Sequence, residues 1–360
     1  MSACDDCLRR TDLIAAVAGR LDVEWRRRSA PAAVLSLPDE GLVALDSTGV
    51  AARRYASFSP GGARAAIDAA GLDAVCRCTP DYPERLRELA DPPAVLHIAG
   101  DPRALDAPEC VAIVGARRGT AYGMEVARSL GRGLAASGVP VISGMALGVD
   151  SAAHVGALEA STPPVAVLAG GADVPYPPSR RALYGRIVAR GCVVSELPPR
   201  FGAFRWSFVA RNRIIAGLAA LTVVVEAAER SGSLTTADFA TQLGRTVGAV
   251  PGPVTSRFSA GTNGLLAAGA GLVRDTRDVL DQLLGPSAPQ HVEQPQAVPI
   301  EPRLRGLLDA IERGHGSLAE LSTDPDETRQ VLQDLTDLEL RGLVRREFGG
   351  RYVRALEGRS

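Results

Sequence analysis

The chain has 360 residues, an apolar fraction of 46% and a formal net charge of −1. This length suits two or three globular domains, each large enough to bury its own core. No apolar run reaches the ~18 residues that a membrane-spanning helix needs, and the N-terminal stretch MSACDDCLRRTDLIAA is acidic before its apolar part, unlike a secretion signal. A membrane protein and a secreted protein are therefore not expected, and we expect the protein in the cytoplasm.

The charge is unevenly distributed along the chain. Residues 1–110 carry 13 arginines and 17 acidic residues, residues 111–285 carry 17 and 11, and residues 291–360 carry 10 and 13, so the net charges are −4, +6 and −3. Every one of the 40 basic residues is arginine. The middle region alone is expected to attract an anionic ligand.

The first predicted domain, residues 1–78, is a small helical (SAM-like) domain. Between residues 8 and 75 the apolar residues recur at helical spacing, as at Leu13, Ile14 and Val17, with short polar breaks. A proline-rich crossing, TPDYPERLRELADPPAVLHIAGDP, then leads into the middle region.

Four of the six cysteines form two close pairs, Cys4 with Cys7 and Cys76 with Cys78. No histidine lies at zinc-ligand spacing near either pair. In a reducing compartment we predict plain reduced thiols. We expect neither a metal nor another cofactor.

Residues 79–285 alternate short apolar runs with segments of helix length. The run LTVVV at residues 221–225 is typical of a strand that is covered on both faces. The alternation predicts a Rossmann-like α/β domain with a doubly wound parallel sheet. The predicted strands are residues 110–114, 139–142, 165–168, 192–195, 221–225 and 247–250.

Glycine-bearing loops follow four of these strands. Ligands of such a sheet bind at the carboxyl ends of the strands, and the backbone N–H groups of a glycine turn at a helix N-terminus suit phosphate. Tight packing of helices is the alternative reason for several of these glycines. The loops supply Gly115, Arg117 and Arg118 after the first strand, Ser143 and Gly144 after the second, Gly170 and Gly171 after the third, and Ser231, Gly232 and Ser233 after the fifth.

Arginines alternate with aromatic residues beside these loops, a pattern that suits unpaired nucleic acid because each stacked base contributes ~1–3 kcal/mol. A dinucleotide is disfavoured because the first loop, GARRGT, lacks the third glycine of GxGxxG, and no Walker motif is present. A place in the core is the alternative for Trp206 and for the phenylalanines at 201, 204 and 208. The candidate DNA-binding residues here are Arg180, Arg181, Arg205, Trp206, Arg211, Asn212 and Arg213.

The segments VAIVGARRGTAYG, ISGMALGVDSAAHVGAL, FVARNRIIAGL, EAAERSGSLTTADFA and GRTVGAVPGP resemble, in the right order, the DNA-processing protein A (DprA, also called Smf) family. The resemblance runs from about residue 80 to residue 285. It implies a protein without enzymatic activity that binds single-stranded DNA as a homodimer, protects it in natural transformation and helps load the RecA recombinase.

Matching positions carry over Arg117, Ser143, Gly144, Gly170, Gly171, Arg211, Asn212, Arg213 and the Ser231–Ser233 turn. The chain departs from the family where relatives carry lysines. Arg180 or Arg181, and Arg200 or Arg205, are the expected substitutes, although a guanidinium is not equivalent to an ammonium group.

The alternative class is an enzyme similar to nucleotide phosphoribohydrolases, whose PGGxGTxxE turn carries a catalytic glutamate. The matching turn here, SGSLTTADF, lacks the double glycine and the glutamate. We expect Asp238 to be a solvated residue of the first helical turn. For Glu196 and Glu226 we expect structural roles, as acceptors for backbone N–H groups or arginines.

The C-terminal part is predicted as a linker, residues 286–300, and a winged-helix domain, residues 301–360. Its third helix, residues 324–340, carries six acidic residues against Arg329 alone, so this domain is expected to contact protein; Arg345, Arg346 and Arg351 favour DNA instead. The apolar run at residues 264–273 is the candidate dimer contact, with a plain packing helix as its alternative.

Overall fold

The computed structural model describes residues 3–28, 34–286, 301–322, 324–340, 343–346 and 350–354. The chain divides into two compact units, Met1–His291 and Val292–Ser360. The predicted linker lies outside the described residues except for Pro286.

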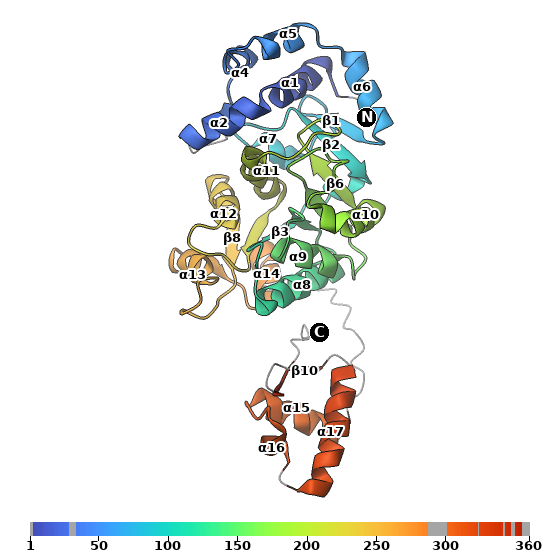
Figure 1. The fold of residues 1–360 in the computed structure, drawn as a ribbon, viewed down its shortest axis with the longest axis vertical. Coiled ribbons are helices and arrows are strands. Elements are labelled where there is room, and N and C mark those ends of the chain that lie inside the picture. Colours follow the sequence, from blue (N-terminus) through green and yellow to red (C-terminus); the bar gives the residue numbers. More distant parts are fainter. Residues whose placement is uncertain are drawn as a thin grey trace. The chain divides into compact units, whose positions relative to one another are not determined.

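A nine-stranded sheet forms the centre of the first unit (Figure 1), in the order β1-β2-β6-β5-β4-β3-β7-β8-β9. Neighbouring strands from β6 to β9 in this order are parallel, whereas β2 runs antiparallel to β6 and β1 antiparallel to β2. The strands are β1 (Asp73–Cys76), β2 (Val95–Gly100), β3 (Val111–Val114), β4 (Val141–Ser143), β5 (Val165–Val167), β6 (Cys192–Ser195), β7 (Leu221–Val224), β8 (Thr246–Ala249) and β9 (Gly271–Leu272).

The predicted parallel α/β sheet is therefore confirmed, with a strand at each of the six predicted places. Strands β1, β2 and β9 were not predicted, since β2 follows Pro92 and Pro93 and β9 has two residues. Because β1 pairs with β2, the sheet begins before residue 79.

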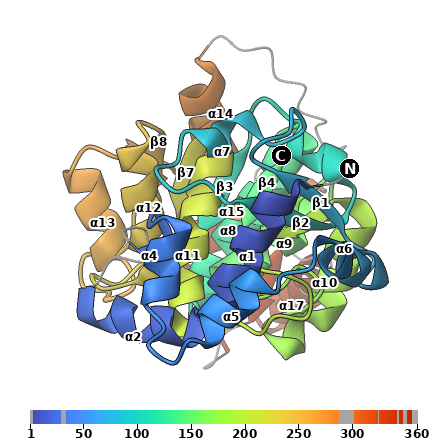
Figure 2. The same cartoon turned by 90° about the horizontal axis from the view of Figure 1, so that it is seen from above.

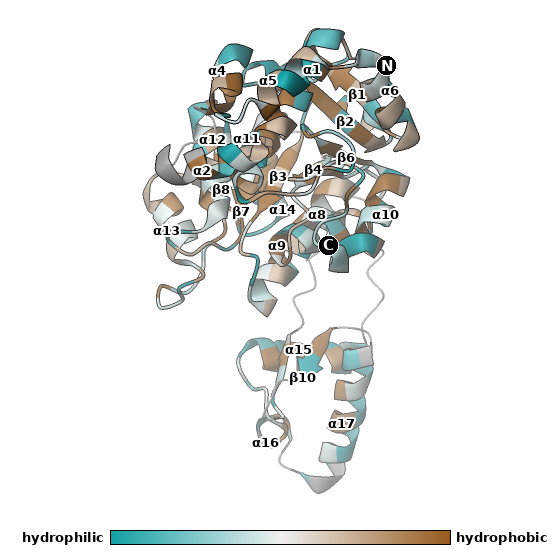
Figure 3. Cartoon of the chain, turned by 45° about the horizontal axis from the view of Figure 1, so that its top comes forward, coloured by the Kyte–Doolittle hydropathy of each residue, from teal (hydrophilic) through white to brown (hydrophobic). Residues whose placement is uncertain are grey.

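Helices cover both faces of this sheet. Along β3, Val111 and Ile113 pack with one group of helices and Ala112 and Val114 with the other, the alternation that a pleated strand imposes. In Figure 3 the strands are largely apolar. One face carries α8 (Ala121–Ala136), α9 (Val149–Ala157), α10 (Arg181–Arg190) and α14 (Thr276–Leu284), and the other carries α7 (Glu84–Arg87), α11 (Arg205–Leu218) and α12 (Gly232–Gln242); α13 (Ala260–Ala267) contacts β8.

The N-terminal segment is helical, and it packs directly on the sheet domain. Its helices share a core with Leu197, Trp206 and Ala210, and the backbone N–H of Trp206 donates to Asp22 at 3.3 Å. The N-terminal helices are α1 (Asp5–Ala16), α2 (Ala18–Arg28), α4 (Asp39–Ala44), α5 (Val50–Ala56) and α6 (Pro60–Ala69). Figure 2 shows α2 beside α11, and α6 on the side of β1 and β2.

The second unit contains α15 (Pro302–Glu312), α16 (Leu318–Leu321), α17 (Pro325–Leu340) and the antiparallel strands β10 (Val344–Arg346) and β11 (Tyr352–Arg354). The elements follow in the predicted order, and the assignment to the winged-helix class stays a prediction. Across the described parts of both units, no helix is long and apolar enough to cross a membrane.

Candidate nucleic-acid interface

The order of the strands reverses between β3 and β7, because the chain adds β4, β5 and β6 on one side of β3 and β7, β8 and β9 on the other. Open α/β sheets bind ligands outside the carboxyl ends of the strands at such a point. Two loops meet there. The backbone N–H of Ala116, after β3, donates to the carbonyl of Glu226, after β7, at 2.7 Å.

The carboxylate of Glu226 holds the first loop in place. It accepts the backbone N–H of Thr120 at 2.8 Å and the hydroxyl of Thr120 at 2.6 Å. Thr120 also caps α8 by accepting the N–H of Gly123 at 3.1 Å. The structural role predicted for Glu226 is confirmed, and the loop that carries Arg117 is fixed at both ends.

Arg117 extends from this loop and is exposed. Its guanidinium lies 4.9 Å from the ring centroid of Phe208 on α11, and that ring lies 5.1 Å from the ring of Tyr176, which follows β5. Tyr176 is 42% exposed. We call Arg117, Phe208 and Tyr176 the stacking group. A cation for phosphate and two aromatic rings therefore lie together, with Arg118 exposed beside Arg117 in the sequence.

The Ser231–Ser233 turn begins α12, as predicted. The Ser231 Oγ accepts the Ser233 N–H at 3.4 Å and lies 2.6 Å from the Ser233 Oγ. Gly232 is exposed, and a Cβ added to it would meet no atom within 4 Å. The exposed Gly232 thus places the N-terminus of a helix of 11 residues at the switch point, where the positive end of the helix favours an anion.

The three residues of the RNR segment are buried on α11, contrary to the expectation of direct phosphate contacts. Arg213 is 2% exposed and pairs with Asp91 at 2.9 Å and with Glu196 at 2.7 Å. Asn212 donates to the carbonyl of Gly232 at 3.1 Å and to Thr235 at 2.8 Å. A buried guanidinium must be paired within the fold, so we do not expect Arg213 on the DNA-contacting surface.

Arg211 is also buried and bonds to segments beneath the predicted site. It is 6% exposed, donates to the carbonyl of Val167 at 2.7 Å and lies 3.6 Å from Asp150. Burial lowers the pKa of Arg211 and raises that of Asp150, while each charge partly offsets the shift of the other. Asp150 accepts the N–H of Gly144 at 3.2 Å, which ties the loop after β4 to α11. No sequence motif indicated a role for Asp150.

The second and third loops are closely packed. Ser143 is fully buried, and its hydroxyl donates to the carbonyl of Ile113 at 2.6 Å. A Cβ on Gly144 would collide with the Arg211 guanidinium, and one on Gly170 would lie 2.9 Å from the carbonyl of Phe201. The Gly171 N–H donates to that same carbonyl at 2.8 Å. A Cβ on Gly115 would similarly lie 2.8 Å from Val149, so close packing explains these glycines.

The division of the aromatic residues between the core and the surface differs from the prediction. Trp206 is 1% exposed in the core that α11 shares with the N-terminal helices, so its ring is not a face for a base. Phe201 and Phe204 pack against the same core, as the alternative for them stated. Helical spacing was the available signal, because Trp206 and Ala210 lie one turn apart on the apolar face whereas Phe208 lies between them.

Further arginines lie on the segments predicted to replace the family's lysines. Arg181, Arg200 and Arg205 are exposed, and Arg180 is partly buried. The backbone N–H of Arg200 donates to Asp173 at 2.9 Å. These positions leave Arg181, Arg200 and Arg205 available to an anion.

Two carboxylates that the enzyme alternative would use, those of Glu196 and Asp238, lie in different surroundings. Glu196 is paired with Arg213, which confirms its structural role. Asp238 is exposed as expected, but α12 begins at Gly232, so Asp238 lies in the second turn and not the first.

This architecture defines a Rossmann-like α/β domain with an open helix N-terminus and a cation–aromatic group at its switch point. Residues 73–284 match the model of the family described as DNA recombination-mediator protein A. The chain belongs to this family, as the sequence resemblance indicated.

Individual relatives agree with this assignment. A putative DNA processing protein DprA from Mycobacterium tuberculosis is 41% identical over 284 residues, which are 77% of this chain and 73% of that protein. The X-ray structure of DNA processing protein A from Streptococcus pneumoniae matches with a TM-score of 0.63 at 30% identity, covering 77% of this chain and 96% of that one. A structure of the Helicobacter pylori protein that addresses its single-stranded DNA binding mode matches with a TM-score of 0.54 at 30% identity, covering 60% and 97%.

Proposed function

We propose that this protein binds single-stranded DNA without sequence specificity along the carboxyl edge of its sheet, protects the strand and helps load the RecA recombinase onto it in natural transformation and homologous recombination. Such a role belongs to the cytoplasm. The observation that carries the proposal is the stacking group of Arg117, Phe208 and Tyr176. The single-stranded DNA binding described for the Helicobacter pylori relative supports it.

The chemistry of the surface favours an unpaired strand. Aromatic rings stack on any unpaired base, but a duplex hides the faces of its bases. The exposed turn at Gly232 brings the positive end of a helix to a phosphate of any nucleotide. The net charge of +6 on residues 111–285 adds attraction that does not depend on sequence.

Fluorescence anisotropy with labelled oligothymidine, a mixed-sequence strand and the matching duplex tests the proposal. We expect similar affinity for both single strands, weaker binding of the duplex, and a loss of about 0.7 log unit per neutralised phosphate for each tenfold rise in salt. Tighter binding of the duplex would contradict the proposal. A strong preference for one strand sequence would contradict the absence of sequence specificity.

We also propose that the protein is a homodimer through residues 264–273. Leu265 packs on the core of its own chain, but Gly264, Ala267 and Ala268 are exposed, and Leu272 is 46% exposed. Small residues of this kind permit close approach of a second copy. Light scattering at micromolar concentration is expected to give the mass of two chains, and the mass of one chain would remove this proposal.

For the C-terminal unit we propose a contact with protein rather than with DNA, because the acidic residues of α17 repel phosphate. Arg303 on α15 is already paired with Asp334 at 2.7 Å. Removal of residues 292–360 is expected to leave the affinity for single-stranded DNA unchanged within about twofold. A tenfold loss would assign the unit to DNA.

A further inference from the structure

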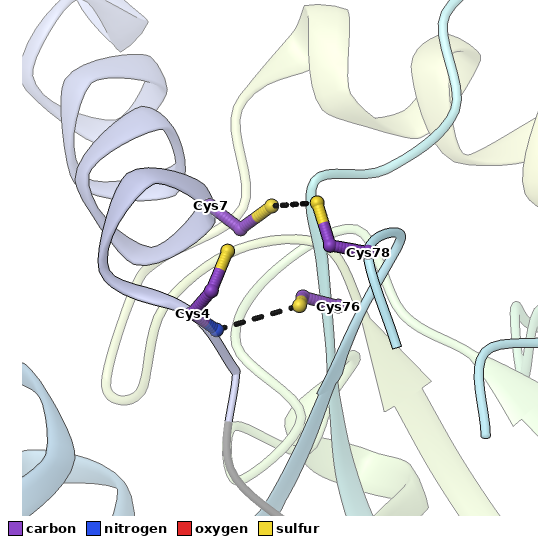
Figure 4. Close-up of side chains that lie close together, drawn as sticks. All are labelled: Cys4, Cys7, Cys76 and Cys78. Atoms are coloured by element: carbon purple, nitrogen blue, oxygen red, sulfur yellow. Dashed lines mark hydrogen bonds between the residues drawn. The ribbon is translucent and has the colours of Figure 1, made fainter. Parts of the chain in front are cut away.

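Two cysteine pairs that are far apart in the sequence meet at the junction of the N-terminal helices and the sheet. Cys4 is the N-cap of α1 and Cys7 lies in its first turn, whereas Cys76 ends β1 and Cys78 follows two residues later. Their four Sγ atoms all lie within 4.8 Å of one another (Figure 4). We call these four residues the cysteine cluster.

The spacing of the sulfur atoms fits a single metal ion. Zinc–sulfur bonds are about 2.3 Å long, so two ligands of a tetrahedral site stand about 3.8 Å apart. The Sγ atoms of Cys7 and Cys78 are 3.6 Å apart. A disulfide requires about 2.05 Å, and all four cysteines are free. An iron–sulfur cluster is larger than one ion and needs ligands that stand further apart.

A helix end and a backbone N–H group lie beside the sulfur atoms of the cysteine cluster. Cys4 and Cys7 sit at the positive end of a helix of 12 residues. The backbone N–H of Cys4 donates to the Sγ of Cys76 at 3.4 Å, the kind of contact that orients a metal ligand. The nearby charge of Asp5 is neutralised by Arg64 at 2.5 Å, and Arg64 also donates to the carbonyl of Ala3 at 3.1 Å.

We propose that Cys4, Cys7, Cys76 and Cys78 bind one zinc ion, which fastens the first N-terminal helix to the edge strand β1. Four protein sulfurs fill a tetrahedral shell and leave no position for water, so the site is structural and not catalytic. Cys7 and Cys76 are buried, Cys4 is partly buried and Cys78 is exposed, so the ion enters from the side of Cys78. The site extends beyond the family match, which begins at residue 73, because Cys4 and Cys7 precede it.

The sequence alone predicted plain reduced thiols, because the two pairs lie about 70 residues apart. Each pair supplies only two of the four ligands of a zinc site, and no histidine near either pair supplies the other two. The antiparallel pairing of β1 with β2 and the packing of α1 beside it bring the pairs together. The signal in the sequence was the presence of two close pairs in one predicted domain.

The test measures metal in the 360-residue chain, expressed with zinc in the medium and purified without chelator. Elemental analysis is expected to give about one zinc ion per chain. Zinc should fall to near zero in Cys7→Ser and in Cys78→Ser. Cys110→Ala and Cys192→Ala are the matched controls, because both remove a buried thiol outside the cysteine cluster, and both should keep the zinc.

Two further measurements keep the proposal falsifiable where a variant does not fold. Cobalt added to the reduced wild-type chain should give the charge-transfer and visible absorption of a tetrahedral thiolate site. The wild-type chain is also unfolded in chelator without reductant, and its free thiols are titrated. All six cysteines should be counted as free thiols, because none is expected in a disulfide. The proposal would be overturned if the wild-type chain contained no zinc and also took up no cobalt. It would likewise be overturned if the four cysteines were oxidised to disulfides, if the chain contained iron with acid-labile sulfide, or if the folded cysteine variants retained zinc.

Discussion

Arg117 and Arg213 show that arginine has two separate roles in this domain, and burial distinguishes them. Arg117 is exposed beside the ring of Phe208, whereas Arg213 is 2% exposed between two carboxylates. Both belong to segments that match the family in sequence. The two positions therefore give opposite predictions for binding and for stability.

Arg117→Ala is expected to lower the affinity for single-stranded DNA by about one to two decades, because a charge-assisted bond to phosphate is lost. The fold should stay intact, since the side chain lies on the surface, and RecA loading should fail with DNA binding. Anisotropy with labelled oligothymidine measures the effect.

Arg103→Ala is the charge control for Arg117→Ala, and the side chain that it removes pairs with Asp101 at 2.6 Å. Arg103 is an exposed arginine that follows β2, and the end of β2 lies opposite Cys192 at the start of β6, so Arg103 lies at the amino edge of the parallel strands. Removal of the same charge there should change the affinity little. Equal losses in the two variants would refute a specific phosphate contact at Arg117.

Arg213→Met is expected to destabilise the protein by about 3–5 kcal/mol, because Asp91 and Glu196 would keep buried charges without a partner. The triple variant that also carries Asp91→Leu and Glu196→Met should recover much of this loss. Urea unfolding measures both. If Arg213→Met were as stable as the wild type but unable to bind DNA, Arg213 would be a DNA contact after all.

At the scale of elements, the N-terminus of α12 offers a test that separates folding from binding. Gly232→Asp should fold normally, because a Cβ meets no atom there and an acidic residue in the first turn suits the helix dipole. The affinity for single-stranded DNA should fall by at least about tenfold, since a carboxylate repels the phosphate expected at this turn.

Gly61→Asp provides the control for Gly232→Asp. Gly61 is exposed in the first turn of α6, and a Cβ added there also meets no atom within 4 Å. The change in net charge and in helix position is thus nearly the same, away from the switch point. Unchanged affinity in Gly232→Asp would show that this turn does not hold phosphate.

The strands that could be predicted from the sequence are those of the parallel part of the sheet, where each strand is buried in the same way. Strands such as β3 are covered on both faces, so their residues form an uninterrupted apolar run. β1 and β2 at the antiparallel edge have no such pattern. For α11, the RNR segment indicated an important place, but charge alone did not reveal that Asp91 and Glu196 arrive from distant segments to pair with Arg213.

For the whole molecule, two buried histidines predict a loss of stability in acid. Burial lowers the pKa of His97 and of His154 to about 4, below the ordinary value of about 6.5. Between these values the unfolded chain binds protons that the folded chain does not. Stability should therefore fall with pH below about 6.5, by up to about 1.4 kcal/mol per pH unit for each histidine.

Urea unfolding at several pH values between 7.5 and 5 measures how the free energy of unfolding changes with pH. Comparison with His154→Leu separates the contribution of this histidine from that of the carboxylates. The variant should lose less stability on acidification than the wild type. Equal slopes in the two proteins would show that His154 is protonated in the folded state.

Helix α11 has consequences for how the protein can be divided and recombined. Its Trp206 side completes the core of the N-terminal helices, while its Phe208 belongs to the stacking group. A gene fragment that starts at residue 79 would expose the indole of Trp206 to solvent and remove β1, one of the two partner strands of β2. Chimaeras between family members should therefore exchange residues 3–76 together with α11, and a foreign N-terminal segment grafted without it should give insoluble protein.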